Sequence, residues 1–268
     1  MNLHRSFSTL GCPCVSFDRA LEIAVENQIP SIELRTLESS LDLPKLLQKR
    51  FGSPQEAHQE KEHFAVEINA LNSSCRALGQ GIRDWKELLE LAPWAEALGA
   101  KYLRVFDARP TKEKITSSML EKANDFFDWW SKQRAENGWR VDVIVETHSI
   151  LTTSMRIIEF QDALKRPAHI LWDSHHTWMF GLEDPIHTWK NIRPWVSHIH
   201  IKDSTRTKDS SKPTYTLPGL GEFPFSDLFA ELKRSGFSGP VSLEWEKHWH
   251  PDLPPLNDSI KACKILGW

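Results

Sequence analysis

Carboxylate side chains end several short apolar runs in the second half of the chain. Glu146 follows Val-Ile-Val, Asp173 follows Ile-Leu-Trp, and Glu244 follows Val-Ser-Leu. Residues 197–204 (SHIHIKDS) carry two histidines two positions apart, followed in the same alternation by a lysine. A carboxylate inside an apolar run is costly to bury unless it is paired or bound to a cation. Each one alone is compatible with a salt bridge or a solvated strand end, but their recurrence predicts a divalent-cation site.

The side chains that can bind a metal in this part of the chain form a short list. They are Glu146, Asp173, His176, His198, His200, Glu244 and Glu246. Three carboxylates with one imidazole make a mostly hard ligand set, which favours Mn²⁺ or Mg²⁺ and also accepts Co²⁺ or Zn²⁺. Four protein ligands leave room in an octahedral shell for water or substrate oxygens, as Lewis-acid catalysis requires.

These residues need strands to position them, and the pattern of the chain predicts eight. Short apolar, β-branched runs predict strands at residues 6–10, 31–35, 65–71, 101–106, 141–146, 168–172, 196–201 and 240–245. Helical patterns follow them at residues 17–27, 43–62, 85–98, 113–136, 152–164, 184–192, 225–235 and 257–265. Strict alternation predicts parallel strands joined by helical crossovers. Eight such units in this length predict one α/β domain, a closed (β/α)8 TIM barrel over residues 1–268.

Local signals mark several element ends. Asp18 is expected to cap the first helix, Gly138 to follow the long fourth helix, and Asn257 to open the last helix. No GxGxxG motif follows the first strand, which argues against a dinucleotide-binding open sheet. Residues 203–218 form a long irregular segment directly after the seventh strand. Because loops at the C-terminal ends of barrel strands carry function, we expect this segment to lie beside the site.

The composition narrows the class of protein. The chain has 268 residues, is 40% hydrophobic and 26% charged, and carries a net charge of −3. We expect no nucleic-acid partner, since nucleic-acid-binding domains usually carry a basic surface. Four scattered cysteines predict free thiols rather than a disulfide framework. Without a long apolar run or an apolar leader, we expect a cytoplasmic protein with no membrane contact.

Several short motifs together resemble one family of enzymes. They are SIELR at residues 31–35, ETH at 146–148, WDSHH at 172–176, HIHIKD at 198–203, PGLGEFP at 218–224 and SLEWE at 242–246. Their order, and their placement on the last four predicted strands, resemble the xylose-isomerase-like TIM-barrel superfamily of sugar isomerases and epimerases. The resemblance covers the whole chain. It implies a divalent-metal-dependent isomerase or epimerase of a monosaccharide or related polyol, which can also form a homo-oligomer.

The resemblance also implies roles for individual residues. Glu146, Asp173, His200 and Glu244 would bind one divalent cation, and His176 of the D-x-x-H pattern would contact the substrate. The two glutamates would also move the protons of the substrate through an enediolate. One base suits an aldose–ketose shift, whereas two opposed carboxylates suit epimerisation.

The seventh and eighth predicted strands leave some roles to be assigned. His200 lies nearer the barrel mouth than His198, so His200 is favoured as the ligand and His198 as a supporting residue one pleat deeper. Lys202 lies one pleat higher and is expected to meet the substrate. Glu244 is favoured over Glu246 because it is nearer the apolar strand, and Glu246 is then expected to face the substrate.

Three further residues are candidates for substrate contact. Arg35 and Arg104 can bind substrate hydroxyls or an anionic group, or can form an internal ion-pair layer with Glu33. Trp178 can belong to a tryptophan-walled sugar pocket, together with Trp172, Trp245 and Trp249. The alternative is that these tryptophans are large core and rim residues.

Other functions are compatible with the same residues. A lyase that dehydrates a keto-inositol or a keto-acid would use the same metal and base to expel a hydroxyl group. An apurinic-site endonuclease shares the barrel, but it would need more histidines and a basic groove, against which the net charge of −3 counts. A barrel that only binds a ligand or partner would not need all three carboxylates and the histidine.

Overall fold

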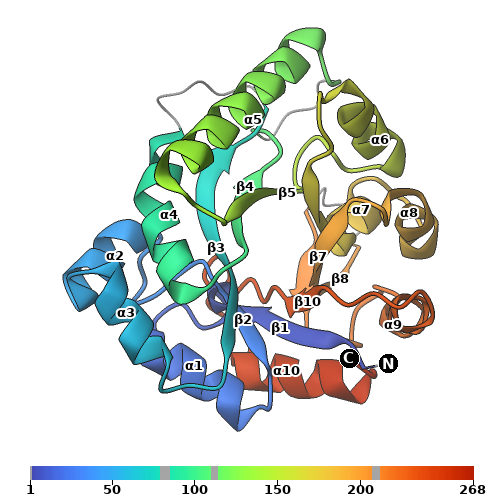
Figure 1. Ribbon diagram of the computed structural model, residues 1–268. Helices are drawn as coiled ribbons and strands as arrows, with labels where there is room; N and C mark the ends of the chain where they lie inside the picture. The colour runs from blue at the N-terminus through green and yellow to red at the C-terminus, as the bar shows by residue number, and fades with distance from the viewer. Residues whose placement is uncertain (1, 79–84, 110–113, 207–211) are drawn as a thin grey trace.

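Eight parallel strands close into a barrel at the centre of the molecule, with helices around its outside (Figure 1). The computed structural model describes residues 2–78, 85–109, 114–206 and 212–268. The barrel strands are β1 (His4–Ser8), β2 (Ser31–Leu34), β3 (Glu67–Arg76), β4 (Tyr102–Phe106), β5 (Asp142–Glu146), β6 (His169–Asp173), β7 (Val196–Ile201) and β10 (Pro240–Leu243). Their order around the barrel is β1-β10-β7-β6-β5-β4-β3-β2. The predicted closed (β/α)8 barrel is confirmed.

The helices pack their apolar faces against the barrel. They are α1 (Phe17–Glu26), α2 (Leu43–Phe51), α3 (Pro54–Lys61), α4 (Lys86–Leu98), α5 (Ser117–Asn137), α6 (Ser154–Ala163), α7 (Ser174–Met179), α8 (Pro185–Ile192), α9 (Phe225–Arg234) and α10 (Leu256–Ile265). The strands are rich in Val, Ile and Leu because a parallel strand inside a shell of helices is buried on both faces. Strand and helix side chains therefore share one hydrophobic core.

Three expectations about helix ends have different outcomes. Gly138 does follow α5, in a left-handed conformation with φ of 69°. Asp18 does not cap α1, because the helix begins at Phe17, two residues earlier than a cap at Asp18 requires, and Ser16 Oγ accepts the Arg19 amide instead. Asn257 does not open α10; Pro255 occupies the cap position. The Asn257 side chain instead accepts a hydrogen bond from Asn27 across the α1–α10 contact.

The predicted helix over residues 43–62 is two helices. Gly52 ends α2 with a φ of 75°, a conformation that glycine adopts at low cost. Ser53 then caps α3 by accepting the Glu56 amide, and Pro54 begins the helix.

Two short elements near the barrel mouth were not predicted. Helix α7 begins directly after β6, where the Asp173 side chain accepts the His176 amide. Strands β8 (Asp203–Thr205) and β9 (Thr214–Thr216) form an antiparallel hairpin, so residues 203–218 are not wholly irregular as predicted. The part of this segment at 207–211 lies outside the described residues.

The strand register gathers polar residues at one end of the barrel. Asp173 in β6 pairs with His200 in β7, and His200 pairs with Ser242 in β10. Glu244 follows two residues after Ser242, and its amide donates to Ile201 O. The carboxyl ends of these strands therefore point their side chains into the same upper layer of the barrel.

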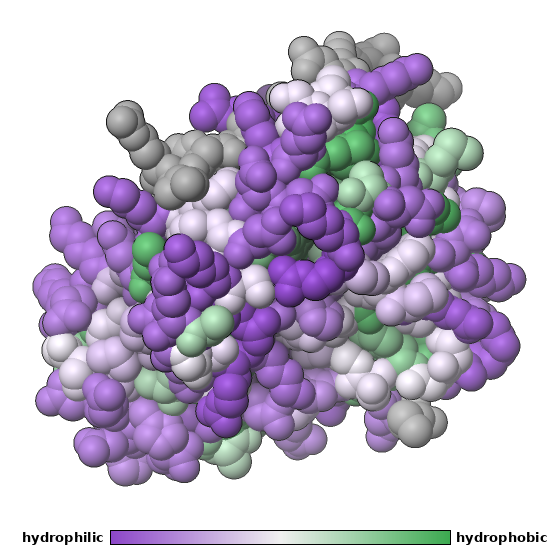
Figure 2. Space-filling model, turned by 45° about the horizontal axis from the view of Figure 1, so that its top comes forward, coloured by the Kyte–Doolittle hydropathy of each residue, from purple (hydrophilic) through white to green (hydrophobic). Residues whose placement is uncertain are grey.

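One face of the outer surface is mainly hydrophilic (Figure 2), and the two ends of the chain lie on the same side of the barrel (Figure 1). Hydrophilic side chains predominate on the face that Figure 2 shows, and apolar ones form small separate groups. The two termini lie close together (Figure 1), since β1 begins beside Pro240 and the Trp268 indole donates to Val241 O. Among the described helices, none combines the length and the apolar character that crossing a membrane would need.

Candidate metal centre

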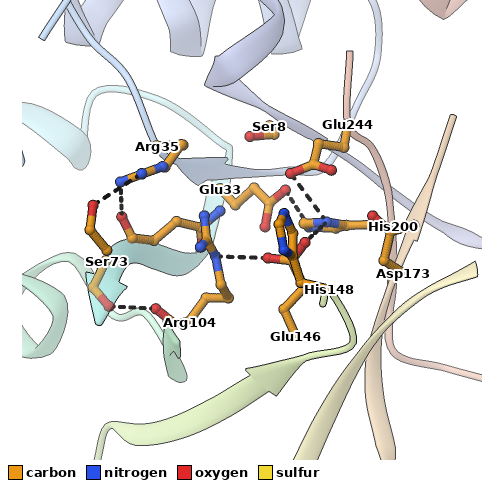
Figure 3. Close-up of polar contacts among 12 residues, drawn as sticks. Ser8, Glu33, Arg35, Ser73, Arg104, Glu146, His148, Asp173, His200 and Glu244 are labelled. Carbon is orange, nitrogen blue, oxygen red and sulfur yellow. Dashed lines mark hydrogen bonds and ion pairs between the residues drawn. The ribbon is translucent and has the colours of Figure 1, made fainter. Parts of the chain in front are cut away.

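Four side chains from neighbouring strand ends converge inside the barrel. Glu146 ends β5, Asp173 ends β6, His200 lies in β7, and Glu244 directly follows β10. One potential ligand atom of each lies within 4.8 Å of the others, and no member of the set is more than 5% exposed. Figure 3 shows these side chains grouped around the His200 ring. The structure thus brings together the four residues predicted as metal ligands.

The His200 ring is oriented by a carboxylate on each side. Its Nε2 lies 2.8 Å from Glu33 Oε1. Its Nδ1 faces Glu244 Oε1 at 3.4 Å and Glu146 Oε1 at 3.8 Å. Burial disfavours the charged ring, but Glu33 and Glu244 outweigh burial and raise the pKa of His200 well above its usual value. Glu33 therefore holds the ring so that Nδ1 is the nitrogen presented to the carboxylates.

Glu33 and His198 form a layer directly below the centre. The His198 Nε2 lies 2.7 Å from Ser242 Oγ and 3.8 Å from Glu33 Oε2. Burial lowers the pKa of His198 to about 4, so this ring is neutral. This supporting place matches the expectation for His198. The contact of Glu33 with His200 was not predicted. The sequence shows Glu33 as an acidic residue inside the apolar second strand, but this position suggested an ion pair with Arg35 or Arg104 instead.

The Lys202 ammonium group is in direct contact with three carboxylates of the centre. Its Nζ is 2.7 Å from Asp173 Oδ2, 2.5 Å from Glu244 Oε2 and 2.9 Å from Glu246 Oε1, and the side chain is fully buried. Against the effect of burial, these three carboxylates raise the pKa of Lys202 well above its usual value. The ammonium group in turn holds the pKa of Glu244 well below its usual range. We predicted that Lys202 would lie one pleat above the metal ligands and meet the substrate. These three contacts with carboxylates were not predicted.

Glu146 has the opposite electrostatic environment. Its Oε2 lies 3.2 Å from the Arg104 Nε, and both side chains are almost completely buried. Burial, reinforced by the charge of Glu244 and opposed by Arg104, raises the pKa of Glu146 to about 8. Glu146 and Glu244 are therefore two carboxyl groups of the same centre with very different proton affinities.

The donor set fits a divalent cation. It consists of three carboxylates and one imidazole, and among the described residues the His200 ring nitrogens have carboxylate neighbours but no hydrogen bond of good geometry. Oxygen-rich sets of this kind suit Mg²⁺ or Mn²⁺, and a single imidazole also suits Zn²⁺ or Co²⁺. Three other groups of potential ligands overlap with this one: Glu33–His198–His200, Glu146–His148–His176 and Asp173–His175–His176. The four-residue set is the one that combines all three carboxylates with a ring nitrogen.

Three histidines lie beside the centre on the α7 side. The His176 Nδ1 is 3.2 Å from Asp173 Oδ2, and its ring meets that of His148 edge-on at 4.8 Å. Burial lowers the pKa of His176 well below its usual value and that of His148 to about 3. His175 points instead to Ser204 Oγ at 2.7 Å and is fully buried. His176 and His148 are thus neutral rings next to a ligand carboxylate.

The residues predicted to contact the substrate through arginine or tryptophan side chains lie in two separate regions of the barrel. Arg35 and Arg104 lie on the β2–β4 side of the barrel, where Figure 3 shows them. Trp178 packs against Phe223, and the Arg206 guanidinium covers its ring at 4.3 Å. Trp172 and Trp245 are completely buried, which supports core packing over a pocket wall for these two, whereas Trp249 is 54% exposed.

Two buried aspartates hold the loops that carry these residues. The Asp107 carboxylate accepts the amides of Ser149, Ile150 and Leu151 in the β5–α6 loop, and that of His148. Asp203 accepts the amides of Gly219, Gly221 and Phe223 after the hairpin. Neither role was predicted, although Asp107 directly follows the apolar run of β4.

A family model described as xylose isomerase-like TIM barrel matches residues 14–266. An inosose dehydratase of Klebsiella pneumoniae subsp. pneumoniae is 25% identical over 226 residues, which cover 74% of this chain and 75% of the relative. This relative is similar along most of its length, and its name describes a dehydration.

Solved structures share the fold over nearly the whole chain. A probable 3-DHS dehydratase, AsbF, from Bacillus anthracis superposes with a TM-score of 0.77 at 18% identity, covering 99% of this chain and 98% of that chain. An IolI protein with a bound zinc atom has a TM-score of 0.75 at 19% identity, covering 99% and 96% of the two chains. At these identities, the superpositions establish a common fold.

Proposed function

The chain belongs to the xylose isomerase-like TIM-barrel family, and from that premise we propose that it is a divalent-cation-dependent enzyme acting on a small hydroxylated ketone derived from a sugar or polyol. The observation that carries the proposal is the convergence of Glu146, Asp173, His200 and Glu244 at the carboxyl end of the barrel, with their ligand atoms within 4.8 Å of one another. Active sites of this fold lie at that end.

The four residues would hold the cation, and Glu33 would fix the His200 ring through its other nitrogen. A bound cation would act as a Lewis acid on the carbonyl oxygen and its neighbouring hydroxyl, which makes the adjacent C–H proton more acidic. Partners that orient a ligating histidine commonly strengthen metal binding.

Glu146 is our candidate for the base of the two glutamates. The Lys202 Nζ lies 2.5 Å from Glu244 Oε2 and occupies that carboxylate, whereas the Arg104 Nε lies 3.2 Å from Glu146 Oε2. We assign Glu146 to remove the proton from the carbon next to the carbonyl group. Lys202 holds the pKa of Glu244 well below its usual range, and neutral His176 would donate a hydrogen bond to a substrate hydroxyl.

Dehydration is our preferred outcome of this proton transfer. Electrons of the broken C–H bond would form a C=C bond as the hydroxyl group on the next carbon departs. The same Glu146 carboxyl group would give this proton to the departing hydroxyl, which leaves as water. The names of the dehydratases similar to this chain support this outcome.

Epimerisation or isomerisation is the second candidate, and a specific geometry favours it. Glu146 and Glu244 come from β5 and the end of β10, which β6 and β7 separate in the barrel. Two carboxylates that approach the substrate from different directions can remove a proton from one face and return it to the other.

The proposal is tested by incubating the Mn²⁺-loaded protein with a panel of inososes, ketoses and hydroxylated keto-acids in D₂O. Dehydration produces a conjugated ketone, visible by ultraviolet absorbance, whereas epimerisation places deuterium on carbon without loss of water. We expect the product only with wild-type protein and not with Glu146→Gln. Absence of any carbon-bound deuterium or conjugated ketone across the panel and with Mg²⁺, Co²⁺ and Zn²⁺ would contradict the proposal.

A further inference from the structure

A second polar group lies on the side of the barrel opposite Lys202. Arg35 follows β2, Asn72 lies in β3, and Arg104 pairs in register with Asn72 from β4. Arg35 is 5% exposed, Arg104 is 1% exposed, and Asn72 is completely buried. Figure 3 shows Arg104 reaching Glu146, with Arg35 on the same side. Arg104 thus contacts the candidate metal centre through Glu146, and Arg35 donates to the backbone of Asn72, the residue beside Arg104 in the sheet.

This group has more hydrogen-bond donors than partners. Arg35 donates through Nη1 to Asn72 O at 3.2 Å and through Nη2 to Ser74 Oγ at 3.1 Å, which leaves other N–H groups of its five free to donate. Among the described residues, the buried Asn72 carboxamide has no partner for its nitrogen or its oxygen, and the Arg104 Nη1 has none either. Buried polar groups are almost always paired, so this concentration calls for a ligand.

The charges point to an anion. The Arg104 Nε lies 3.2 Å from Glu146 Oε2, so a carboxyl group stands at close range to this guanidinium. Within the part of the chain that the structure describes, no carboxylate lies within 4.0 Å of Arg35. The nearby Glu87 accepts the Ser74 amide at 2.9 and 3.1 Å. Burial, with repulsion from Arg104, lowers the pKa of Arg35 to about 10, so Arg35 is still charged near neutral pH.

We propose that Arg35, Asn72 and Arg104 form a subsite that binds a carboxylate group of the substrate, next to the metal centre. This inference rests on the proposed function for the position of the reacting carbon, and it adds that the substrate is a hydroxylated acid rather than a neutral sugar. A guanidinium and a carboxamide offer the paired, planar donors that match the two oxygens of a carboxylate.

A carboxylate fits better than a phosphate group. The subsite has one guanidinium whose charge is not offset at close range, and this matches a single negative charge. A phosphate monoester carries close to two charges at neutral pH and three acceptor oxygens. The neutral alternative, a sugar hydroxyl, would leave the charge of Arg35 buried without compensation.

The test compares matched probes on the Mn²⁺-loaded protein by calorimetry. The carboxylate probes are acetate, D-gluconate and quinate, and their neutral counterparts are acetamide, D-gluconamide and quinate methyl ester. Binding of a phosphate group is tested in the same way by comparing D-glucose 6-phosphate with D-glucose. The variants are Arg35→Gln, the nearly isosteric Asn72→Asp, and Arg134→Gln as a control, since Arg134 pairs with Asp142 at the other end of β5. Mn²⁺ affinity is measured for every variant, so that loss of the cation site is recognised separately.

We expect at least one carboxylate to bind wild-type protein about tenfold or more tightly than its neutral partner, because charge-assisted pairs contribute that much. Arg35→Gln and Asn72→Asp should remove this preference while Mn²⁺ affinity stays within about twofold, and Arg134→Gln should keep it. Carboxylates that bind no better than their neutral partners would overturn the proposal, as would a preference that both variants retain. An Arg35-dependent preference for the phosphate would overturn the choice of carboxylate. Failure of Mn²⁺ binding itself would instead count against the proposed function.

Discussion

At the scale of single residues, the centre is governed by two side chains that hold the proposed ligands. Glu33 contacts His200 Nε2, and Lys202 Nζ forms ion pairs with Asp173, Glu244 and Glu246. The convergence of the four proposed ligands was predictable, because carboxylates at the ends of apolar strands are visible in the sequence. The contacts of Glu33 and Lys202 were not, since the stagger of the barrel decides which residues of separate strands share a layer.

Replacing Glu33 by Gln should weaken cation binding while leaving the fold intact. Glutamine keeps the shape of the side chain, but it removes the negative charge beside His200 Nε2, and partners of this kind are worth about 10–100-fold in metal affinity. Competition with a fluorescent chelator measures the change. The control is Glu67→Gln, an exposed glutamate at the start of β3. Equal affinities for the Glu33 and Glu67 variants would show that Glu33 does not support the ligand.

Replacing Lys202 by Met should destabilise the cation-free protein and increase its stabilisation by Mn²⁺. The change leaves three buried carboxylates without their ammonium group, and breaking a buried pair in this way costs about 3–5 kcal/mol. A divalent cation would then compensate the same charges. Thermal unfolding with and without Mn²⁺ measures both effects, with exposed Lys190→Met as the control. A Mn²⁺-induced shift in Tm no larger than that of wild type would contradict this account.

At the scale of elements, loops and short helices place the residues around the centre. The eight barrel strands were predictable because short apolar, β-branched runs alternate with helical patterns along the chain. Helix α7 has six residues, too few for a periodic pattern, and the Asp173 side chain caps its start. The β8–β9 hairpin is polar and pairs with itself, so no apolar alternation revealed it. These two elements lie at the mouth, where the sequence pattern is weakest.

The β5–α6 loop depends on Asp107, and Asp107→Asn should loosen it. The buried carboxylate accepts the amides of Ser149, Ile150 and Leu151 at 2.7 to 2.9 Å, and an amide group would present N–H donors to some of them. We expect a loss of about 3 kcal/mol in the free energy of unfolding. Urea unfolding and hydrogen exchange of the loop amides check this, with exposed Asp162→Asn as the control. Unchanged exchange at these three amides would rule out the anchoring role.

At the scale of the whole molecule, the barrel closes where its first and last strands meet. β1 pairs with β10 over four registered positions, and the Trp268 indole donates to Val241 O in β10, one of the two strands of this seam. The closed topology was predictable from eight alternating units. The part played by the last residue was not, because it follows the last helix and depends on the packing of α10.

Trp268→Ala should destabilise the whole barrel. The side chain is 7% exposed, and its indole donates to Val241 O at 3.0 Å. Loss of a buried tryptophan costs about 3–5 kcal/mol, whereas Trp268→Phe keeps most of the packing and should cost about 1 kcal/mol for the hydrogen bond. Denaturant unfolding of both variants measures the difference. Equal, small losses for the two variants would mean that the C-terminus does not secure the seam.

The central claim is that Glu146, Asp173, His200 and Glu244 bind one divalent cation. Its most direct test is the metal content of protein that is stripped with a chelator, reloaded with Mn²⁺ and freed of excess metal, measured by elemental analysis. We predict about one Mn²⁺ per chain for wild type, and almost none for Asp173→Asn or Glu244→Gln, with folding confirmed by circular dichroism. The control Asp162→Asn should retain the metal. Wild-type protein that holds no cation, or ligand variants that keep a full equivalent, would contradict the account.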